Sequence, residues 1–176
     1  MKKVEGITDC TEQRIATPSN AKMQYQTYCQ YKSANTLKKL IVCTKYGSIS
    51  FISDAYGGGA ASDRFITEDC GVVSKFNRNM VALVDSGFNV QDLFLAYHVT
   101  VAIPPFTKGK THFTKVQFEQ AKTISRARLH VERAIGRLKE FKLLSHELPL
   151  NMLDLADYIW IIAGAITNLQ PPLVIE

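Results

Sequence analysis

Apolar residues along the chain gather in short runs separated by polar turns, and one long segment in the C-terminal half repeats them at helical spacing. Short runs bounded by turn residues predict strands, and apolar residues three and four positions apart predict a helix. Strands alternating with helices, with no evident linker, predict one α/β domain with a mixed sheet. The expected strands are 4–10, 40–44, 48–53, 80–84 and 99–103, and the expected helices begin at 63 or span 90–97, 115–144 and 153–169.

The segment 122–139 sorts into separate faces when it is read as a helix. Glu132 lies at the edge between an apolar and a basic face, with Arg128 one turn before it. Two interpretations stay open: an ordinary ion pair between these two residues, or a metal ligand beside cations that hold phosphates. The apolar face, suited to covering a sheet, consists of Ile124, Ala127, Val131, Ile135 and Leu138. The basic face consists of Lys122, Arg126, Arg133 and Arg137.

The composition is that of a folded protein, with 46% apolar and 21% charged residues, and it argues against a disordered chain. The net charge is +5, and the excess is concentrated between residues 108 and 142, a region that begins with a basic loop holding Lys108 and Lys110. Such clustering favours a polyanionic partner, because surfaces that bind nucleic acids gather cations on one face.

The cysteine pattern and the apolar runs bear on the compartment. The four cysteines show no zinc-ligand spacing and the N-terminal residues do not read as a signal peptide, so we expect reduced thiols in an intracellular protein. The most apolar segment, 158–166, is too short to span a bilayer, and no membrane is expected as a partner.

A polar, turn-rich segment at 17–35 holds three tyrosines, Tyr25, Tyr28 and Tyr31. Exposed aromatic side chains can stack on unpaired bases. Aromatic side chains of a turn-rich segment more often pack against the neighbouring sheet. We favour packing here, and stacking stays open as the alternative.

Three carboxylates carry the candidate chemistry. Asp9 and Asp85 each end a predicted strand, and ligands gather at such ends in open α/β sheets. Glu132 lies on a helix that would pack across the sheet. If the two strands are neighbours the three acids converge, and like charges at close range repel unless a cation neutralises them. Oxygen ligands favour Mg²⁺ or Mn²⁺, and a pair of such ions supports phosphoryl transfer.

Seven segments in a fixed order carry a resemblance to a known family. They include Val-Asp-Ser-Gly-Phe at 84–88 and His-Val-Glu-Arg-Ala-Ile-Gly at 130–136, and the others are 7–12, 31–36, 51–58, 61–67 and 103–106. Together they resemble the catalytic domain of Harbinger-type DDE transposases over nearly all of residues 1–176. The resemblance implies a ribonuclease-H-like fold, a mixed sheet flanked by helices in a single domain, and an acidic triad of Asp9, Asp85 and Glu132.

Asp63 is a further candidate metal ligand, because it matches the family's aspartate after the glycine-rich turn. We favour Asp85 as the second acid of the triad, since in a ribonuclease-H-like sheet that acid follows the strand next to the first. Asp63 would instead begin a helix for which Ser62 is the N-cap.

The expected function is therefore a metal-dependent DNA endonuclease or strand-transferase of the DDE transposase type, using Mg²⁺ or Mn²⁺ and located in the nucleus. The alternative is an inactive or domesticated transposase remnant that serves as a nucleic-acid-binding or protein-interaction module. The residues expected to contact DNA phosphates are Arg128, Arg133, Arg137, Lys108 and Lys110.

Three departures from the family pattern limit this expectation. Ser86 stands where family members often carry an arginine or lysine, Gly59 stands where an arginine or a small polar residue is common, and the sequence begins at the first catalytic strand. Family members usually carry a helical region before that strand, which binds the transposon ends. We therefore expect DNA binding with little sequence selectivity, with a separate DNA-binding protein or a second copy of the chain as further partners.

Overall fold

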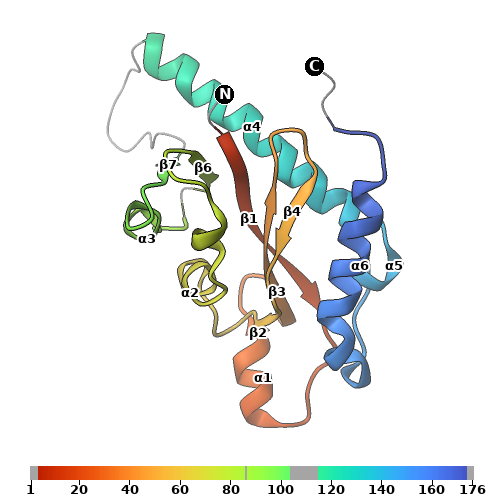
Figure 1. The fold of residues 1–176 in the computed structure, drawn as a ribbon. Helices are drawn as coiled ribbons and strands as arrows, with labels where there is room; N and C mark the ends of the chain where they lie inside the picture. The colour runs from red at the N-terminus through yellow and green to blue at the C-terminus, as the bar shows by residue number, and fades with distance from the viewer. Residues whose placement is uncertain (1–3, 86, 104–114, 174–176) are drawn as a thin grey trace.

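The computed structural model describes residues 4–85, 87–103 and 115–173, which form a curled mixed sheet flanked by helices (Figure 1). The single α/β domain that the sequence predicted is confirmed, and its layout is consistent with a ribonuclease-H-like fold. The strands are β1 (Val4–Arg14), β2 (Tyr28–Cys29), β3 (Ala34–Cys43), β4 (Ile49–Ile52), β5 (Tyr56–Gly57), β6 (Val81–Val84) and β7 (Thr100–Ala102). The helices are α1 (Ala21–Thr27), α2 (Asp63–Asp69), α3 (Gln91–Leu95), α4 (Lys115–Leu138), α5 (Lys142–Ser145) and α6 (Ala156–Asn168), with short 3-10 helices η1 (Val72–Lys75) and η2 (Leu150–Leu155).

Strand β1 is the centre of the sheet, whose order is β2-β3-β1-β6-β7 with β4 and β5 also paired to β3. It runs antiparallel to β3 and parallel to β6, where Thr8 lies opposite Val84. The strand continues four residues beyond the predicted end at residue 10. Polar residues end the apolar pattern there, yet Gln13 is buried because its amide donates to the carbonyl of Leu143 and accepts from the indole of Trp160 at 2.8 Å.

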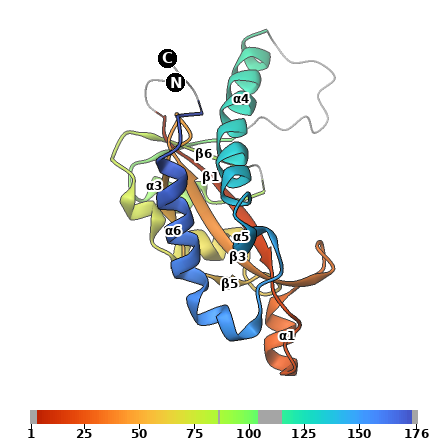
Figure 2. The same cartoon turned by 90° about the vertical axis from the view of Figure 1, so that its right-hand side faces the viewer.

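Each face of the sheet has its own helices (Figure 1). Ile7 and Leu83 belong to the core cluster under α4 and α6, whereas Val84 and Leu40 belong to the cluster under α2 and α3. In the turned view α6 lies in front of β3 (Figure 2). The apolar face predicted for the long helix is confirmed, since Ala127, Val131 and Leu138 are fully buried and Ile124 and Ile135 pack against the same core.

The helical elements differ from the prediction in two places, and one predicted cap is confirmed. The segment expected to be rich in turns contains α1, which Asn20 caps by accepting from the backbone N–H of Met23 at 3.1 Å. The long helix stops at Leu138, and the chain turns so that Phe141 packs on the core before α5. Ser62 caps α2 as predicted, with its hydroxyl accepting from the N–H of Phe65 at 3.1 Å.

The apolar segment that was expected to be too short to span a bilayer belongs to a longer helical stretch, which is long and apolar enough to do so. Helices η2 and α6 join into one stretch, Leu150–Asn168, of 19 residues with a mean hydropathy of 1.3. One side of this stretch is buried in the domain through Trp160 and Ala163, while Tyr158 and Ile162 are exposed on the other side. Length and composition alone are weak evidence for a membrane segment, because core helices of soluble proteins pass the same test.

Candidate active site

The parallel register of β1 and β6 places two of the predicted acids side by side. Thr8 lies opposite Val84, so that Asp9 and Asp85 follow at the same level of the sheet. Asp85 directly follows β6, as the sequence predicted. Asp9 lies within β1 rather than at its end, because pairing with β3 carries the strand on to Arg14. Asp9 comes two residues after Ile7, and Asp85 comes two residues after Leu83. Side chains two positions apart in a strand point to the same face, so both acids lie on the face that α4 covers.

Helix α4 contributes a guanidinium and the third predicted acid. Nη1 of Arg128 lies 3.1 Å from Oδ1 of Asp85, and Nη2 lies 3.8 Å from Oε1 of Glu132. The i, i+4 pair that the sequence suggested for Arg128 and Glu132 is therefore present, together with a second contact across to the sheet. Asp85 and Glu132 are separated by the width of one guanidinium group.

Asp63 approaches the same place from the other side of the sheet. It begins α2, whose Ile66 belongs to the core cluster opposite α4. Its carboxylate lies 2.6 Å from Nζ of Lys38. The ion pair raises the pKa of Lys38 above its usual value even though burial of the ammonium acts in the opposite direction. A lysine thus already neutralises Asp63, which distinguishes it from Asp9.

A hollow of about 270 Å³ is lined by Asp9, Asp63 and Asp85, but not by Arg128 or Glu132. It opens beside β1 at the point where β6 ends, and Tyr31 and Phe88 form part of its wall. Acidic and basic side chains both line it, so that a metal ion and a phosphate would each find partners of opposite charge. The acids in its lining are Asp9, Glu12, Asp63 and Asp85, and the lysines are Lys32, Lys38 and Lys139.

Asp9 is the acid most affected by this environment. Burial raises its pKa from 3.8 to about 6, against the backbone N–H of Cys10, which donates to Oδ1 at 2.8 Å, and against the charge of Arg128. The nearby carboxylates of Asp85 and Asp63 raise the pKa further. Ionisation of Asp9 is therefore less favourable than that of an exposed aspartate, and a cation bound beside it would offset this cost.

The acids do not form a ready-made metal site. Within residues 4–85, 87–103 and 115–173, no three acidic, histidine or cysteine side chains converge closely enough to hold an ion as they stand. The donor set nevertheless fits a hard divalent cation, because Asp9, Asp85 and Glu132 offer carboxylate oxygens alone. The guanidinium of Arg128 also shows that the space between Asp85 and Glu132 accepts positive charge.

The other predicted phosphate contacts have varied surroundings. Arg133 is exposed on α4. Arg137 donates to the carbonyl of Pro171 at 2.8 Å, which ties α4 to the segment after α6. Lys108 and Lys110 lie outside the described residues.

The packing predicted for the tyrosines is wrong. Tyr25 and Tyr31 are 82% and 87% exposed, and Tyr28 is 44% exposed. Tyr31 lies in the turn between β2 and β3, where the ammonium of Lys32 is 4.9 Å from its ring centroid. An aromatic ring and a cation therefore stand together at the rim of the acidic hollow.

Sequence reasoning missed the lysines of the hollow. Lys139 comes one residue after the apolar face of α4 ends, and its ammonium donates to the carbonyl of Glu12 at 3.0 Å. Burial lowers its pKa, and the charge of Lys32 lowers it further. The position of Lys139, two residues after Arg137 and directly after the last residue of α4, was the signal in the sequence that could have identified it.

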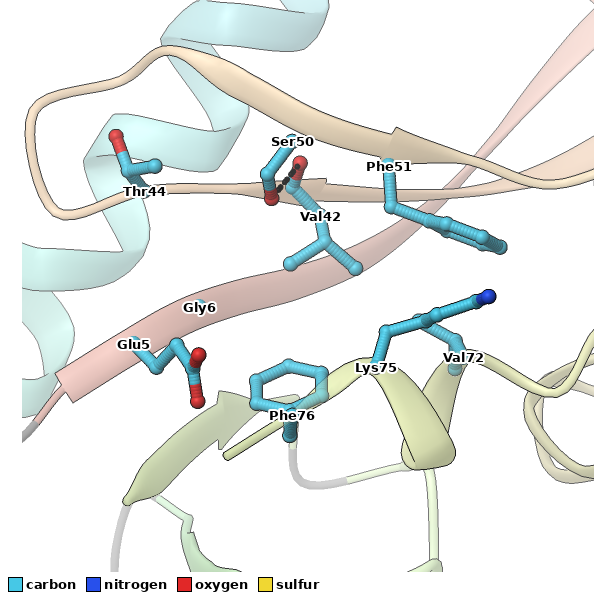
Figure 3. Close-up of a pocket in the computed structure, with 9 residues that line it drawn as sticks. All are labelled: Glu5, Gly6, Val42, Thr44, Ser50, Phe51, Val72, Lys75 and Phe76. Atoms are coloured by element: carbon cyan, nitrogen blue, oxygen red, sulfur yellow. Dashed lines mark hydrogen bonds between the residues drawn. The ribbon is translucent and has the colours of Figure 1, made fainter. Parts of the chain in front are cut away.

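A second hollow, of about 470 Å³, lies on the face of the sheet away from α4 (Figure 3). Val42, Phe51 and Phe76 give it largely apolar walls, and the carboxylate of Glu5 at its edge already accepts from the backbone N–H of Asn77 at 2.8 Å. None of the predicted acids lines it. The acids and lysines that line the first hollow make it the stronger candidate for a catalytic site.

Comparison with known proteins gives one match. A family model described as "DDE superfamily endonuclease" matches residues 8–168, which include the candidate acids and Arg128. The comparisons with curated proteins and with solved structures gave no match.

Proposed function

Because the chain belongs to the family of DDE superfamily endonucleases, we propose that it is a divalent-metal-dependent DNA endonuclease or strand-transferase, and that it is a Harbinger-type member acting in the nucleus. The observation that carries the proposal is the register of β1 and β6, which sets Asp9 beside Asp85 on the face covered by α4. Glu132 of α4 is one guanidinium away from Asp85.

Asp9, Asp85 and Glu132 would hold Mg²⁺ or Mn²⁺. When bound, such ions activate a water or a 3′-hydroxyl for attack on a phosphodiester and stabilise the leaving oxygen. The raised pKa of Asp9 fits a ligand whose ionised form a bound cation would stabilise. Asp63 would serve mainly to hold Lys38 at the wall of the hollow, since the two are only 2.6 Å apart.

The remaining side chains of the hollow would bind the substrate. Lys32 and Lys139 line it together with the acids and would contact phosphates on either side of the scissile bond. Arg133 would extend this contact along α4. None of these groups reads base edges in a groove, so the binding would tolerate many sequences. Specific targeting would then depend on a separate DNA-binding protein or a second copy of the chain.

The direct test is cleavage of supercoiled plasmid DNA with Mn²⁺ or Mg²⁺. Nicking is expected with either ion, and chelation or Asp85→Asn should abolish it. Asp154→Asn is the matched control, because Asp154 is exposed on η2 and lies outside the hollow. Nicking that survives Asp85→Asn would assign the activity to another site or to a contaminant.

One observation favours a second function, a domesticated remnant that binds DNA without cutting it. A guanidinium that stays on Asp85 and Glu132 would neutralise both acids and leave no place for an ion. The plasmid assay separates the two functions, since the remnant would retain binding and show no metal-dependent nicking in the unaltered protein.

A further inference from the structure

We propose that Arg128 is a displaceable counter-ion, which competes with the divalent cation for Asp85 and Glu132 and leaves them when the cation binds. The inference rests on the proposed function, because it presumes that these acids are metal ligands. It assigns to Arg128 a positioning role that differs from the simple phosphate contact expected from the sequence.

The geometry carries this inference. Nη1 of the guanidinium is 3.1 Å from Oδ1 of Asp85, and Nη2 is 3.8 Å from Oε1 of Glu132. The guanidinium of Arg128 thus lies between Asp85, which directly follows β6, and Glu132, which lies in the C-terminal half of α4. A cation that used oxygens from both acids would have to enter the same space. Arg128 and the cation therefore exclude one another at this position.

The contacts are suited to exchange. The side chains of Asp85 and Glu132 are 34% and 51% exposed, so that water screens both ion pairs. A long flexible side chain joins the guanidinium of Arg128 to α4. The guanidinium can therefore move away from the two acids by rotation about side-chain bonds, while the helix stays in place. A divalent ion brings twice the charge to the same acids.

Deprotonation of Arg128 offers no way to release the guanidinium. Arginine keeps its charge throughout the working pH range, and a change of pH in that range would leave Arg128 itself unaltered. A competing cation on the acids, or a competing anion on the guanidinium, is required. A phosphate of the substrate is such an anion, because it can bind a guanidinium through two parallel hydrogen bonds.

The test is Mn²⁺ binding by isothermal titration calorimetry to the full chain and to Arg128→Gln. Removing the competitor should tighten Mn²⁺ binding about threefold to tenfold, the range expected for two screened ion pairs. Arg133→Gln is the matched control, because it removes the same charge from an exposed position on the same helix and should change the affinity less than twofold. Arg128→Lys keeps the charge without the fork and should fall between the unaltered protein and Arg128→Gln.

Each outcome decides the inference. Equal affinity of Arg128→Gln and the unaltered protein would overturn it, and so would weaker binding, which would mean that Arg128 holds the acids in place for the ion. Circular dichroism and the melting temperature without metal establish that each variant is folded. Absence of Mn²⁺ binding in every protein tested would overturn the metal site itself, and with it the proposed function. Tighter binding by Arg128→Gln alone supports both.

Discussion

Thr8 of β1 lies opposite Val84 of β6 in a parallel register, and this pair sets the two strands level beside the candidate site. The residue that follows each of them is an aspartate, and both aspartates face the helix that carries Glu132. Arg128 of that helix contacts both Asp85 and Glu132. The roles that we propose for these groups can be measured separately through stability, metal binding and DNA binding.

Asp9→Asn should stabilise the protein at neutral pH. In the folded state the pKa of Asp9 is raised from 3.8 to about 6, mainly by burial. The folded protein therefore binds more protons than the unfolded chain between these values, and the free energy of unfolding falls as the pH rises through this window. Above it, ionised Asp9 costs up to about 3 kcal/mol. The asparagine variant should gain about 1–3 kcal/mol at pH 7.5 and nothing below about pH 4.

Urea unfolding at several pH values measures this difference. Asp154→Asn, at an exposed position, should show almost no change at any pH. A loss of stability in Asp9→Asn at pH 7.5 would mean that the contacts of the carboxylate with the N–H of Cys10 and with Arg128 outweigh its burial.

Glu132→Gln should remove most of the stabilisation that Mn²⁺ gives. A ligand at 100 times its dissociation constant adds about 2.7 kcal/mol to the folded state, and this gain depends on the carboxylates that hold it. The melting temperature with and without Mn²⁺ gives the comparison. Glu140→Gln, an exposed change just after α4, should leave the gain intact. Equal gains for Glu132→Gln and the unaltered protein would place the ion elsewhere.

The sequence predicted the elements that depend on local patterns. The apolar run at 80–84 gave β6, Ser62 gave the start of α2, and the spacing from Ala127 to Leu138 gave the buried face of α4. Each of these signals is contained within a few turns or one strand.

What the sequence did not reveal depends on partners far along the chain. The polar residues after Cys10 suggested that the strand ends there, although it in fact continues. Gln13 can be buried in it only because Trp160 and Leu143 satisfy its amide. Lys39 is likewise buried at 1% exposure through its ion pair with Asp157. In the candidate site, the contact of Arg128 with Asp85 needs α4 to be placed on the sheet, which no local pattern contains.

Tyr31→Ala should weaken binding to single-stranded DNA more than binding to duplex. The ring of Tyr31 is 87% exposed at the rim of the acidic hollow, and stacking of one base on such a ring contributes about 1–3 kcal/mol. Fluorescence anisotropy with a labelled oligonucleotide measures the loss. Tyr31→Phe keeps the stacking surface and should bind like the unaltered protein. If the alanine variant also binds normally, unpaired bases do not contact this ring.

Charge reversal on α4 and directly after it should weaken binding to duplex DNA without regard to its sequence. Arg133→Glu and Lys139→Glu each remove a cation from the side of the molecule that holds the acids, and the affinity for unrelated duplexes should fall by a similar factor. Binding should also weaken steeply with salt, because each phosphate contact releases counterions and contributes a slope of about −0.9 in log affinity against log salt. Each lost contact should make this slope shallower by about one.

Lys75→Glu is the matched control for the change in net charge. Lys75 is exposed at the hollow on the opposite face of the sheet, and its reversal changes the net charge of the protein by the same amount. If only the total charge attracted DNA, all three variants would lose affinity equally. If the DNA lies along α4 and the acidic hollow, Lys75→Glu should bind nearly as well as the unaltered protein. Selective loss of binding to one duplex in Arg133→Glu would contradict a contact made to phosphates alone, because phosphates carry no sequence information.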